Sequence, residues 1–277
     1  ISSASSLRSS VTAAWGAFSG KTRSSRGAIA TGCSHGTPIF VTRACVILDL
    51  YAGFWEDQRL GTADYVLSAD EKSIQVLARL HPGLPAAPGQ VQRVEFENQR
   101  LGTVAYHAAW DVFRGQLFGR VAPTTSIATF GELLDLVMGQ APYQTAERVF
   151  WIVDGGSAHH RNTFPARLQS RYANAVAVLL PVHASWLNQI EIYFSIVQRK
   201  VLTPLDVASE ETLTQRLLGF RDYYQERAQP FSWKFTADDL KKRLEAVQEF
   251  SLQGSITPIV SGVWGSCPTH IVRRINR

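Results

Sequence analysis

Apolar residues along this chain form runs and periodic patterns that predict strands and helices. RVFWIVD (148–154) is a continuous apolar run, typical of a strand covered on both faces. TSIATFGELLDLVMGQA (125–141) repeats apolar residues at helical spacing, and Thr125 or Ser126 is placed to cap this helix. The other predicted elements are short strands at 62–70, 103–112, 116–123 and 175–182, and helices at 164–173, 185–201, 209–226 and 236–250.

The order of these elements indicates the fold class. A hairpin-length loop at 113–115 joins the second and third strands, and the Pro- and Gly-rich stretch 81–90 is a longer loop. Three antiparallel strands followed by helix–strand–helix–strand–helix predict a mixed α/β fold, with a five-stranded sheet flanked by helices. Sites in such sheets gather where strands end, and we expect both Asp70 and Asp154 at strand ends.

The two ends of the chain differ from its middle. Residues 1–44 hold ten serines, no acidic residue and no sustained period, so we expect them to be poorly ordered. Periodicity is also lost in 251–277, which we expect to be a loose tail. The folded domain is therefore expected at 45–250.

Charge changes this picture only slightly. The net charge is +5, but five Lys and Arg lie in 1–44 and three in 251–277. Residues 45–250 contain the remaining 20 basic residues and all 23 acidic residues, so the expected domain is slightly acidic. Binding to nucleic acid would therefore need a local basic face.

Several protein classes are excluded by composition. No window offers 18 consecutive apolar residues, so we expect no membrane span, and the N-terminus lacks the apolar core of a secretory signal. The three cysteines are far apart without a CxxC pair. This argues against a disulfide framework or a zinc site and favours a reducing cytoplasm.

The stretch VFWIVDGGSAHH (149–160) raises a question about chemistry, because a buried strand ends on the carboxylate Asp154 and two glycines follow. Such a carboxylate is rigidly aimed, and glycines let a backbone or a phosphate approach closely. An Asp-Gly pair is also an ordinary turn, and Asp154 alone does not decide between the two.

A second carboxylate lies on the predicted helix 185–201. Trp186, Ile190 and Phe194 lie on one apolar stripe of that helix, with Glu191 at its border and Asn188 one turn earlier. Glu191 is thus expected at the margin of the core, although most helix glutamates are simply solvated.

Asp70, Asp154 and Glu191 together suit divalent metal ions. Hard cations prefer a few carboxylate oxygens and keep positions for water and phosphate. Two such ions about 4 Å apart can activate water and stabilise the leaving oxygen in phosphodiester cleavage. Without a cation, three clustered carboxylates would resist ionising together.

Five motifs give the chain a family resemblance. LSADEKS (67–73), GTVAYHAAWDV (102–112), WIVDGGSAHH (151–160), PVHASWLNQIEIYFSIVQRK (181–200) and PFSWKFTADDLKKRL (230–244) occur in order. They resemble bacterial insertion-sequence transposases related to mariner, the insertion-sequence six-thirty family with its DDE endonuclease domain. The resemblance covers roughly 45–250, and the interval of 36 residues between Asp154 and Glu191 suits this family.

The resemblance implies a ribonuclease H-like fold in which Asp70, Asp154 and Glu191 bind two Mg²⁺ or Mn²⁺ ions. It implies hydrolysis at transposon ends and strand transfer to target DNA at TA, by a homodimer in a synaptic complex near the bacterial nucleoid. His159 matches a family histidine, either a phosphate contact or an ordinary loop residue. Asn188 matches the family's W-L-N run and would steady the site.

The chain departs from the family pattern in three places. Gly155 stands where the family usually has Asn, and His160 where it often has Arg, which removes an amide and a phosphate contact. The N-terminal helix-turn-helix pattern is missing. Residues 27–40 can be back-translated so that another frame resembles the family's connector, so our hypothesis is that 1–44 are a frameshifted product.

Three basic residues are further candidates. Arg199 and Lys200 follow Glu191 by two helical turns and would hold DNA phosphates, or simply form a solvated helix end. Lys72, two residues after Asp70, would reach a phosphate or face solvent.

Two other functions stay open. One is a catalytically dead, transposase-derived DNA-binding or interaction protein, which Gly155 and the missing recognition pattern favour. The other is a metal phosphohydrolase with a different substrate.

Overall fold

The computed structural model describes residues 38–81, 83–93, 97–156, 163–203 and 205–253, and these divide into two compact units. The smaller unit comprises 1–58 and 233–277. In it, helix α2 (Pro38–Tyr51) packs against helix α7 (Ala237–Gln253), and the rings of Tyr51 and Trp233 lie 5.1 Å apart. Two short strands, β1 (Phe54–Trp55) and β2 (Gln58–Arg59), follow α2.

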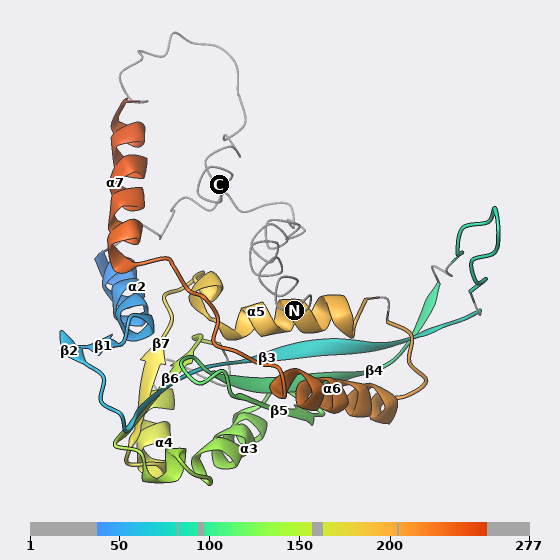
Figure 1. The fold of residues 1–277 in the computed structure, drawn as a ribbon, viewed down its shortest axis with the longest axis horizontal. Helices are drawn as coiled ribbons and strands as arrows, with labels where there is room; N and C mark the ends of the chain where they lie inside the picture. Colours follow the sequence, from blue (N-terminus) through green and yellow to red (C-terminus); the bar gives the residue numbers. More distant parts are fainter. Residues whose placement is uncertain (1–37, 82, 94–96, 157–162, 204, 254–277) are drawn as a thin grey trace. The chain divides into compact units, whose positions relative to one another are not determined.

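The larger unit, Arg59–Ser232, is built on a mixed five-stranded sheet of order β5-β4-β3-β6-β7 (Figure 1). The strands are β3 (Asp64–Arg79), β4 (Asn98–Asp111), β5 (Leu117–Ala122), β6 (Arg148–Val153) and β7 (Ala175–Leu179). The first three are antiparallel, whereas β6 and β7 run parallel to β3. The predicted mixed sheet flanked by helices is confirmed.

Helices cover both faces of this sheet. They are α3 (Ile127–Met138), α4 (Phe164–Arg171), α5 (Ile190–Lys200) and α6 (Glu210–Gln225), with single 3-10 turns η2 (Tyr143–Thr145) and η3 (Ser185–Leu187). Leu67, Phe130, Trp151 and Phe164 belong to the core under α3 and α4. On the other face α5 packs on β3 and α6 on β4 and β5.

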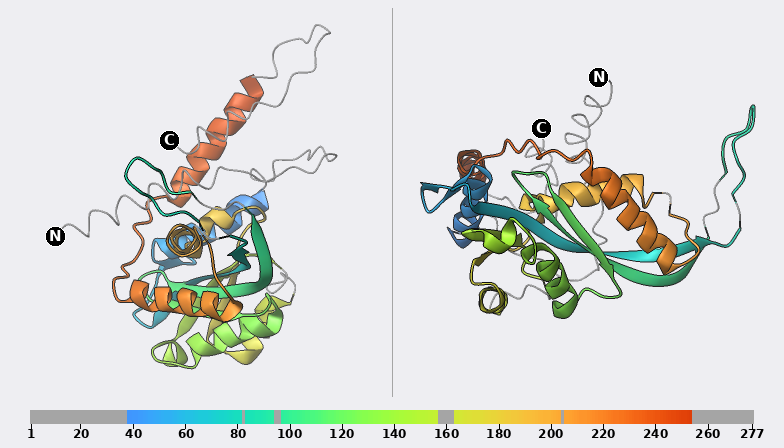
Figure 2. Two further views of the ribbon diagram at one scale, coloured as in Figure 1. Left: turned by 90° about the vertical axis from the view of Figure 1, so that its right-hand side faces the viewer. Right: turned by 60° about the horizontal axis from the view of Figure 1, so that its bottom comes forward.

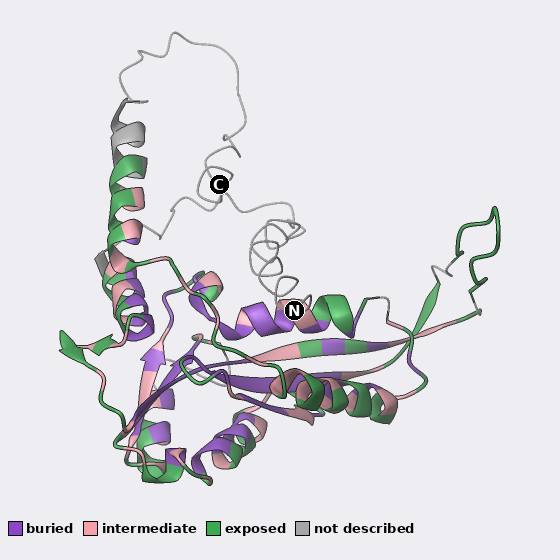
Figure 3. Ribbon diagram, viewed as in Figure 1, coloured by how far each residue is buried: buried purple, intermediate pink, exposed green. Residues whose placement is uncertain are grey.

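Successive residues of β3 point to opposite faces, and this alternation positions the site. Leu67 and Ala69 belong to the core under α3 and α4, so Ser68 and Asp70 face α5. Figure 3 shows the buried central part of the sheet against which α5 lies.

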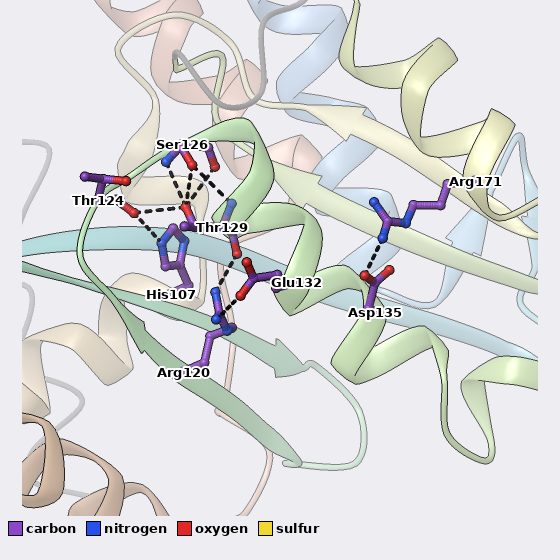
Figure 4. A network of polar contacts seen from close by, with 8 residues as sticks. All are labelled: His107, Arg120, Thr124, Ser126, Thr129, Glu132, Asp135 and Arg171. Atoms are coloured by element: carbon purple, nitrogen blue, oxygen red, sulfur yellow. Dashed lines mark hydrogen bonds and ion pairs between the residues drawn. The ribbon is translucent and has the colours of Figure 1, made fainter.

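The N-terminus of α3 begins as the sequence predicts, with Ser126 as the cap (Figure 4). Thr129 N–H donates to Ser126 Oγ (3.1 Å), and Ser126 N–H donates to Thr129 Oγ1 (2.9 Å). Just before the cap, buried His107 on β4 donates from Nε2 to the Thr124 carbonyl (3.2 Å). The two bonds between Ser126 and Thr129 satisfy N–H groups that a helix start leaves without partners in the helix.

Strand β3 is much longer than the predicted strand at 62–70, so the expectation that Asp70 ends a strand is wrong. The parallel ladder with β6 stops at Ser68, but β3 continues along β4, which still pairs with β5 as far as Ala105, opposite Ser73. Beyond Ser73, β3 and β4 form a two-stranded ribbon that extends to Arg79 (Figure 2). Ile74 and Val76 are buried on this ribbon between more exposed neighbours. Asp70 therefore lies within β3, just beyond its parallel contact with β6.

Two other expectations need correction. Helix α2 begins at Pro38, so 38–44 are helical, and the expected boundaries at 44 and 250 are not those of the two units. The segment 185–201 is not one helix, because η3 ends at Leu187 and α5 begins only at Ile190. Trp186 is consequently half-buried and lies outside the stripe expected for α5.

None of the helices in the described part of the chain has the length and apolar character that a bilayer crossing requires.

Candidate functional site

Asp70 and Asp154 occupy equivalent places on two neighbouring parallel strands. Ser68 pairs with Ile152 in the last step of the β3–β6 ladder, and each aspartate lies two residues further along its strand. Because parallel strands run in the same direction, both carboxylates lie where this ladder ends. The structure thus brings together two residues that are 84 positions apart in the sequence.

Asp70 is 8% exposed, and hydrogen bonds hold both of its carboxylate oxygens. Oδ1 accepts from the backbone N–H of Glu71 (2.8 Å), and Oδ2 accepts from Asn188 Nδ2 (3.3 Å). These two donors fix the direction in which the carboxylate points.

Asp154 directly follows β6 and is half-buried. Its Oδ1 accepts from the backbone N–H of Gly156 (2.8 Å). A Cβ added to Gly156 would lie 2.9 Å from that same oxygen. An alanine at position 156 would therefore require the Asp154 carboxylate to shift, whereas Gly155 is exposed.

Glu191 lies in the first turn of α5 and is half-buried, as its place on the core margin predicted. Its backbone N–H donates to the Asn188 carbonyl (3.1 Å). Burial raises the pKa of its carboxyl group, the positive charge of Lys72 opposes this, and the charge of Asp154 adds to it.

The three carboxylates influence one another electrostatically. The pKa of Asp70 is raised well above its ordinary value by burial, then by the negative charges of Asp154 and Glu191. Mutual repulsion is the behaviour expected of acidic groups gathered in one site. Tertiary structure has thus brought Asp70, Asp154 and Glu191 within electrostatic range of one another.

The chemistry of this donor set fits a hard divalent cation, which prefers carboxylate oxygens and would offset their repulsion. The spacing of the three carboxylates is less favourable for binding a metal ion. Within the described residues, no group of three or more His, Cys, Asp and Glu side chains is arranged to hold a metal ion as it stands. Direct coordination by all three carboxylates would require their side chains to move closer together.

Asn188 and Ser68 connect β3 to the start of α5. Asn188 is 1% exposed and donates from Nδ2 to the Ala69 carbonyl (3.1 Å) as well as to Asp70. Ser68 is fully buried, and its hydroxyl donates to Asn188 Oδ1 and accepts from Ile190 N–H (2.8 Å). The sequence analysis did not single out Ser68, although a serine in a buried strand two residues before Asp70 was a usable signal.

The remaining candidates are only partly associated with these carboxylates. Lys72 is half-buried and close enough for its charge to lower the pKa of Glu191. Arg199 and Lys200 are exposed in the last turn of α5, about 12 Å along the helix from Glu191 at 1.5 Å per residue. His159 lies outside the described residues.

Comparisons with known proteins identify the family and the fold of this chain. Residues 65–214, more than half of the chain, match the family model described as DDE superfamily endonuclease. This matched region contains all three carboxylates. A comparison with curated protein sequences found no significant match.

Solved structures of the Mos1 transposase are similar in fold. The Mos1 strand transfer complex has a TM-score of 0.50 and 13% identity, covering 87% of this chain and 68% of that one. The Mos1 mariner paired end complex with Mn has a TM-score of 0.49 and 12% identity, covering 86% and 68%. The complex with Mg has a TM-score of 0.49 and 14% identity, covering 84% and 67%.

The sheet order and the likeness to the strand transfer complex confirm the ribonuclease H-like fold. The family model spans the strands β3 to β7 and the helix that carries Glu191. This chain belongs to the DDE superfamily endonuclease family.

Proposed function

We propose that this chain is the catalytic domain of a DNA transposase, in which Asp70, Asp154 and Glu191 hold two Mg²⁺ or Mn²⁺ ions. The observation that supports the proposal is the electrostatic coupling of these three carboxylates at the end of the β3–β6 ladder. When bound, such ions supply an activated water and stabilise the leaving oxygen of a phosphodiester. In this proposal Asp70 would contact both ions, and Asp154 and Glu191 would each hold one.

The substrate we propose is DNA, first the two ends of a transposon and then a target at TA. Hydrolysis would free a 3′-hydroxyl at the transposon end, and that hydroxyl would attack the target. The resemblance to the insertion-sequence six-thirty family supports this substrate and a homodimer that holds two ends. Arg199 and Lys200, exposed at the end of α5, are suited to bind the phosphates of the incoming strand.

Asp70→Asn tests this function in the full 277-residue chain. We expect wild type to nick duplex DNA in Mn²⁺ and the variant to lose this activity while keeping its fold, because an amide is a poor ligand for a hard cation. The matched control is Asp222→Asn, which makes the same change on the exposed surface of α6. Nicking by Asp70→Asn at the control rate would contradict the assignment.

A catalytically impaired remnant of a transposase is the second candidate. It is favoured by the spacing of the carboxylates, which do not form a ready metal site, and by Gly155, which offers no side chain beside Asp154. Loss of a group that supports a metal ligand costs roughly 10–100-fold in metal affinity or activity. A remnant would bind DNA or another protein without cutting.

The melting temperature with and without Mn²⁺ separates the two candidates. A metal that binds only the folded state raises the melting temperature, so a rise in wild type that Asp70→Asn lacks favours the active enzyme. For the remnant we expect no rise in wild type, and Gly155→Asn is expected to restore both the rise and nicking. Hydrolysis of small phosphoesters in preference to duplex DNA would instead indicate a phosphohydrolase.

A further inference from the structure

Ser68 is a polar residue in a part of β3 that is otherwise apolar and closely packed. It is 0% exposed, as are its neighbours Leu67 and Ala69. A buried hydroxyl is unfavourable unless hydrogen-bonded. Its two bonds, to Asn188 and to the backbone of Ile190, reach 120 and 122 positions along the sequence.

The directions of these hydrogen bonds follow from the chemistry of each group. The N–H of Ile190 can only donate, so the Ser68 oxygen accepts there (2.8 Å). The single hydroxyl proton of Ser68 is then free to be donated to Asn188. The Asn188 atom that receives this proton must be the carbonyl oxygen Oδ1, because the amide nitrogen can donate hydrogen bonds but cannot accept one.

The orientation of the Asn188 amide follows from this. With Oδ1 held by Ser68, the NH₂ group faces the Ala69 carbonyl (3.1 Å) and Asp70 Oδ2 (3.3 Å). A flipped amide would place a carbonyl oxygen against both of these acceptors. Ser68 thus holds the carbonyl end of Asn188, while the NH₂ end faces the Ala69 carbonyl and the Asp70 carboxylate.

Ser68 also holds the start of α5. Ile190 is the first residue of that helix, and the residue after it is Glu191. The first N–H groups of a helix have no partner within the helix, and Ser68 satisfies one of them. One hydroxyl group therefore links the strand that carries Asp70 to the helix turn that carries Glu191.

We propose that Ser68 is a positioning residue, which orients Asn188 toward Asp70 and fixes Glu191 relative to that carboxylate. The proposal rests on the proposed function for its consequence in catalysis. Ser68 itself need not touch metal or DNA.

The first test needs no metal ion. In the full chain without divalent ions, hydrogen exchange of the Asn188 side-chain NH₂ is measured by NMR, with Asn188→Asp identifying its signals. We expect slow exchange in wild type and exchange at least about tenfold faster in Ser68→Ala, because the amide loses its fixed orientation. Exchange within twofold of wild type would overturn the proposal.

The matched control is Ser209→Ala. Ser209 also accepts from a backbone N–H at a helix start, that of Thr212 (3.2 Å), but caps α6. The Ser209→Ala substitution should leave the exchange rate of the Asn188 side-chain NH₂ unchanged. Should Ser68→Ala not fold, Ser68→Cys takes its place, since a thiol of similar size is a weak donor and acceptor. Ser68→Thr keeps the hydroxyl and is expected to retain slow exchange.

The second test measures Mn²⁺ affinity by calorimetry. Ser68→Ala is expected to weaken it roughly 10–100-fold, with nicking recovered at saturating Mn²⁺. If Ser68 acts through Asn188, Ser68→Ala combined with Asn188→Ala should weaken binding no more than Asn188→Ala alone. Additive losses would contradict action through Asn188.

The two tests distinguish failure of this inference from failure of the proposed function. If wild type binds no Mn²⁺, the proposed function is wrong. The exchange rate of the Asn188 amide still decides whether Ser68 orients Asn188. If wild type binds Mn²⁺ and nicks DNA but Ser68→Ala binds Mn²⁺ with the same affinity, the positioning role of Ser68 is wrong and the proposed function stands.

Discussion

The backbone amide of Gly156 donates a 2.8 Å hydrogen bond to the carboxylate of Asp154, two residues earlier. This bond accounts for the small residue at position 156, two residues after the acid that ends the buried strand. The chain turns back on Asp154 so closely that a Cβ on Gly156 would lie 2.9 Å from Oδ1. Atoms at that distance must shift.

Gly156→Ala is therefore expected to displace the Asp154 carboxylate and to weaken Mn²⁺ binding at least about tenfold, comparable to losses seen when groups supporting a metal ligand are removed. Isothermal titration calorimetry measures the affinity. Gly219→Ala is the matched control, because nothing lies within 4 Å of its added Cβ. Gly219 lies inside α6, where alanine should stabilise by about 0.5–1 kcal/mol. Equal Mn²⁺ affinity in both variants would show that Asp154 does not need its present position.

The raised pKa of Asp70 predicts how stability depends on pH in protein without divalent ions. The folded state holds the Asp70 proton more tightly than the unfolded state, whose carboxyl has the ordinary pKa of 3.8. Stability contributed by this group is thus present below pH 3.8 and is lost as pH rises through the folded pKa. Glu191 contributes with the same sign, because its pKa is also raised.

Asp70→Asn should remove much of this dependence, since an amide does not titrate. Urea unfolding at a series of pH values from about 4 to 8, in EDTA, measures it. The free energy of unfolding of wild type relative to Asp70→Asn is expected to decline as pH rises. Parallel curves for the two proteins would contradict the assigned environment of Asp70.

Lys72 is predicted to tune Glu191. Its positive charge lowers the pKa of that carboxyl group, so Lys72→Met should raise this pKa further. Because a carboxyl must lose its proton to bind metal, the pH midpoint of Mn²⁺ binding should move upward. Lys234→Met, at an exposed position of the smaller unit, is the control. An unshifted midpoint would leave Lys72 as a solvent-facing lysine or a phosphate contact.

Arg199 and Lys200 are predicted to act on DNA rather than on metal. Each phosphate contact that is lost lowers the slope of log affinity against log salt by about 1. Replacing both residues by alanine should thus reduce the slope by about 2 in a DNA-binding titration and leave Mn²⁺ affinity unchanged. An unchanged slope would assign them to a solvated helix end.

Arg148, which is half-buried, pairs with the buried carboxylate of Asp64, and this pair is predicted to support the β3–β6 ladder. Arg148 donates from Nε to Oδ1 (2.9 Å) and from Nη2 to Oδ2 (2.8 Å) of Asp64, whose side chain is 1% exposed. Arg148→Ala would remove two hydrogen bonds from a carboxylate that still accepts from Gly61 N–H (2.7 Å), so we expect a loss of about 1–3 kcal/mol in urea unfolding at pH 7. Arg227→Ala, at an exposed pair with Glu226, should cost under about 1 kcal/mol.

The pH dependence gives this prediction a second check. The hydrogen bonds from Arg148 lower the pKa of Asp64, against the opposing effect of burial. Stability from this pair is therefore present above pH 3.8, the ordinary pKa, and is lost as pH falls through the folded pKa. The difference between wild type and Arg148→Ala should shrink in acid, and a constant difference would contradict the role of the charge.

Local sequence patterns predicted helices and strands correctly where a capping residue or a continuous run of apolar residues marks the element. Ser126 was a predicted cap of α3, and the apolar run before Asp154 became β6. Prediction failed at Asp70, where the acidic residue suggested a strand end. The strand continues because β4 supplies a partner as far as Asn98, which no local pattern reveals. The stripe from Trp186 to Ile190 failed because a 3-10 turn ends before α5 begins.

The sequence by itself determined the order of the strands from β3 to β7 and of the helices among them, the acidic residues that give the chain its chemistry, and the resemblance to a DDE endonuclease. These depend on residue type and periodicity, which are local properties. Only the tertiary structure decided that Asp70 and Asp154 face the same place and that Ser68 orients Asn188. Such relations depend on strand register and on hydrogen bonds spanning about 120 positions, as between Ser68 and Asn188. Contacts between residues so far apart in the sequence are set by the packing of the whole sheet, so no short stretch of sequence reveals them.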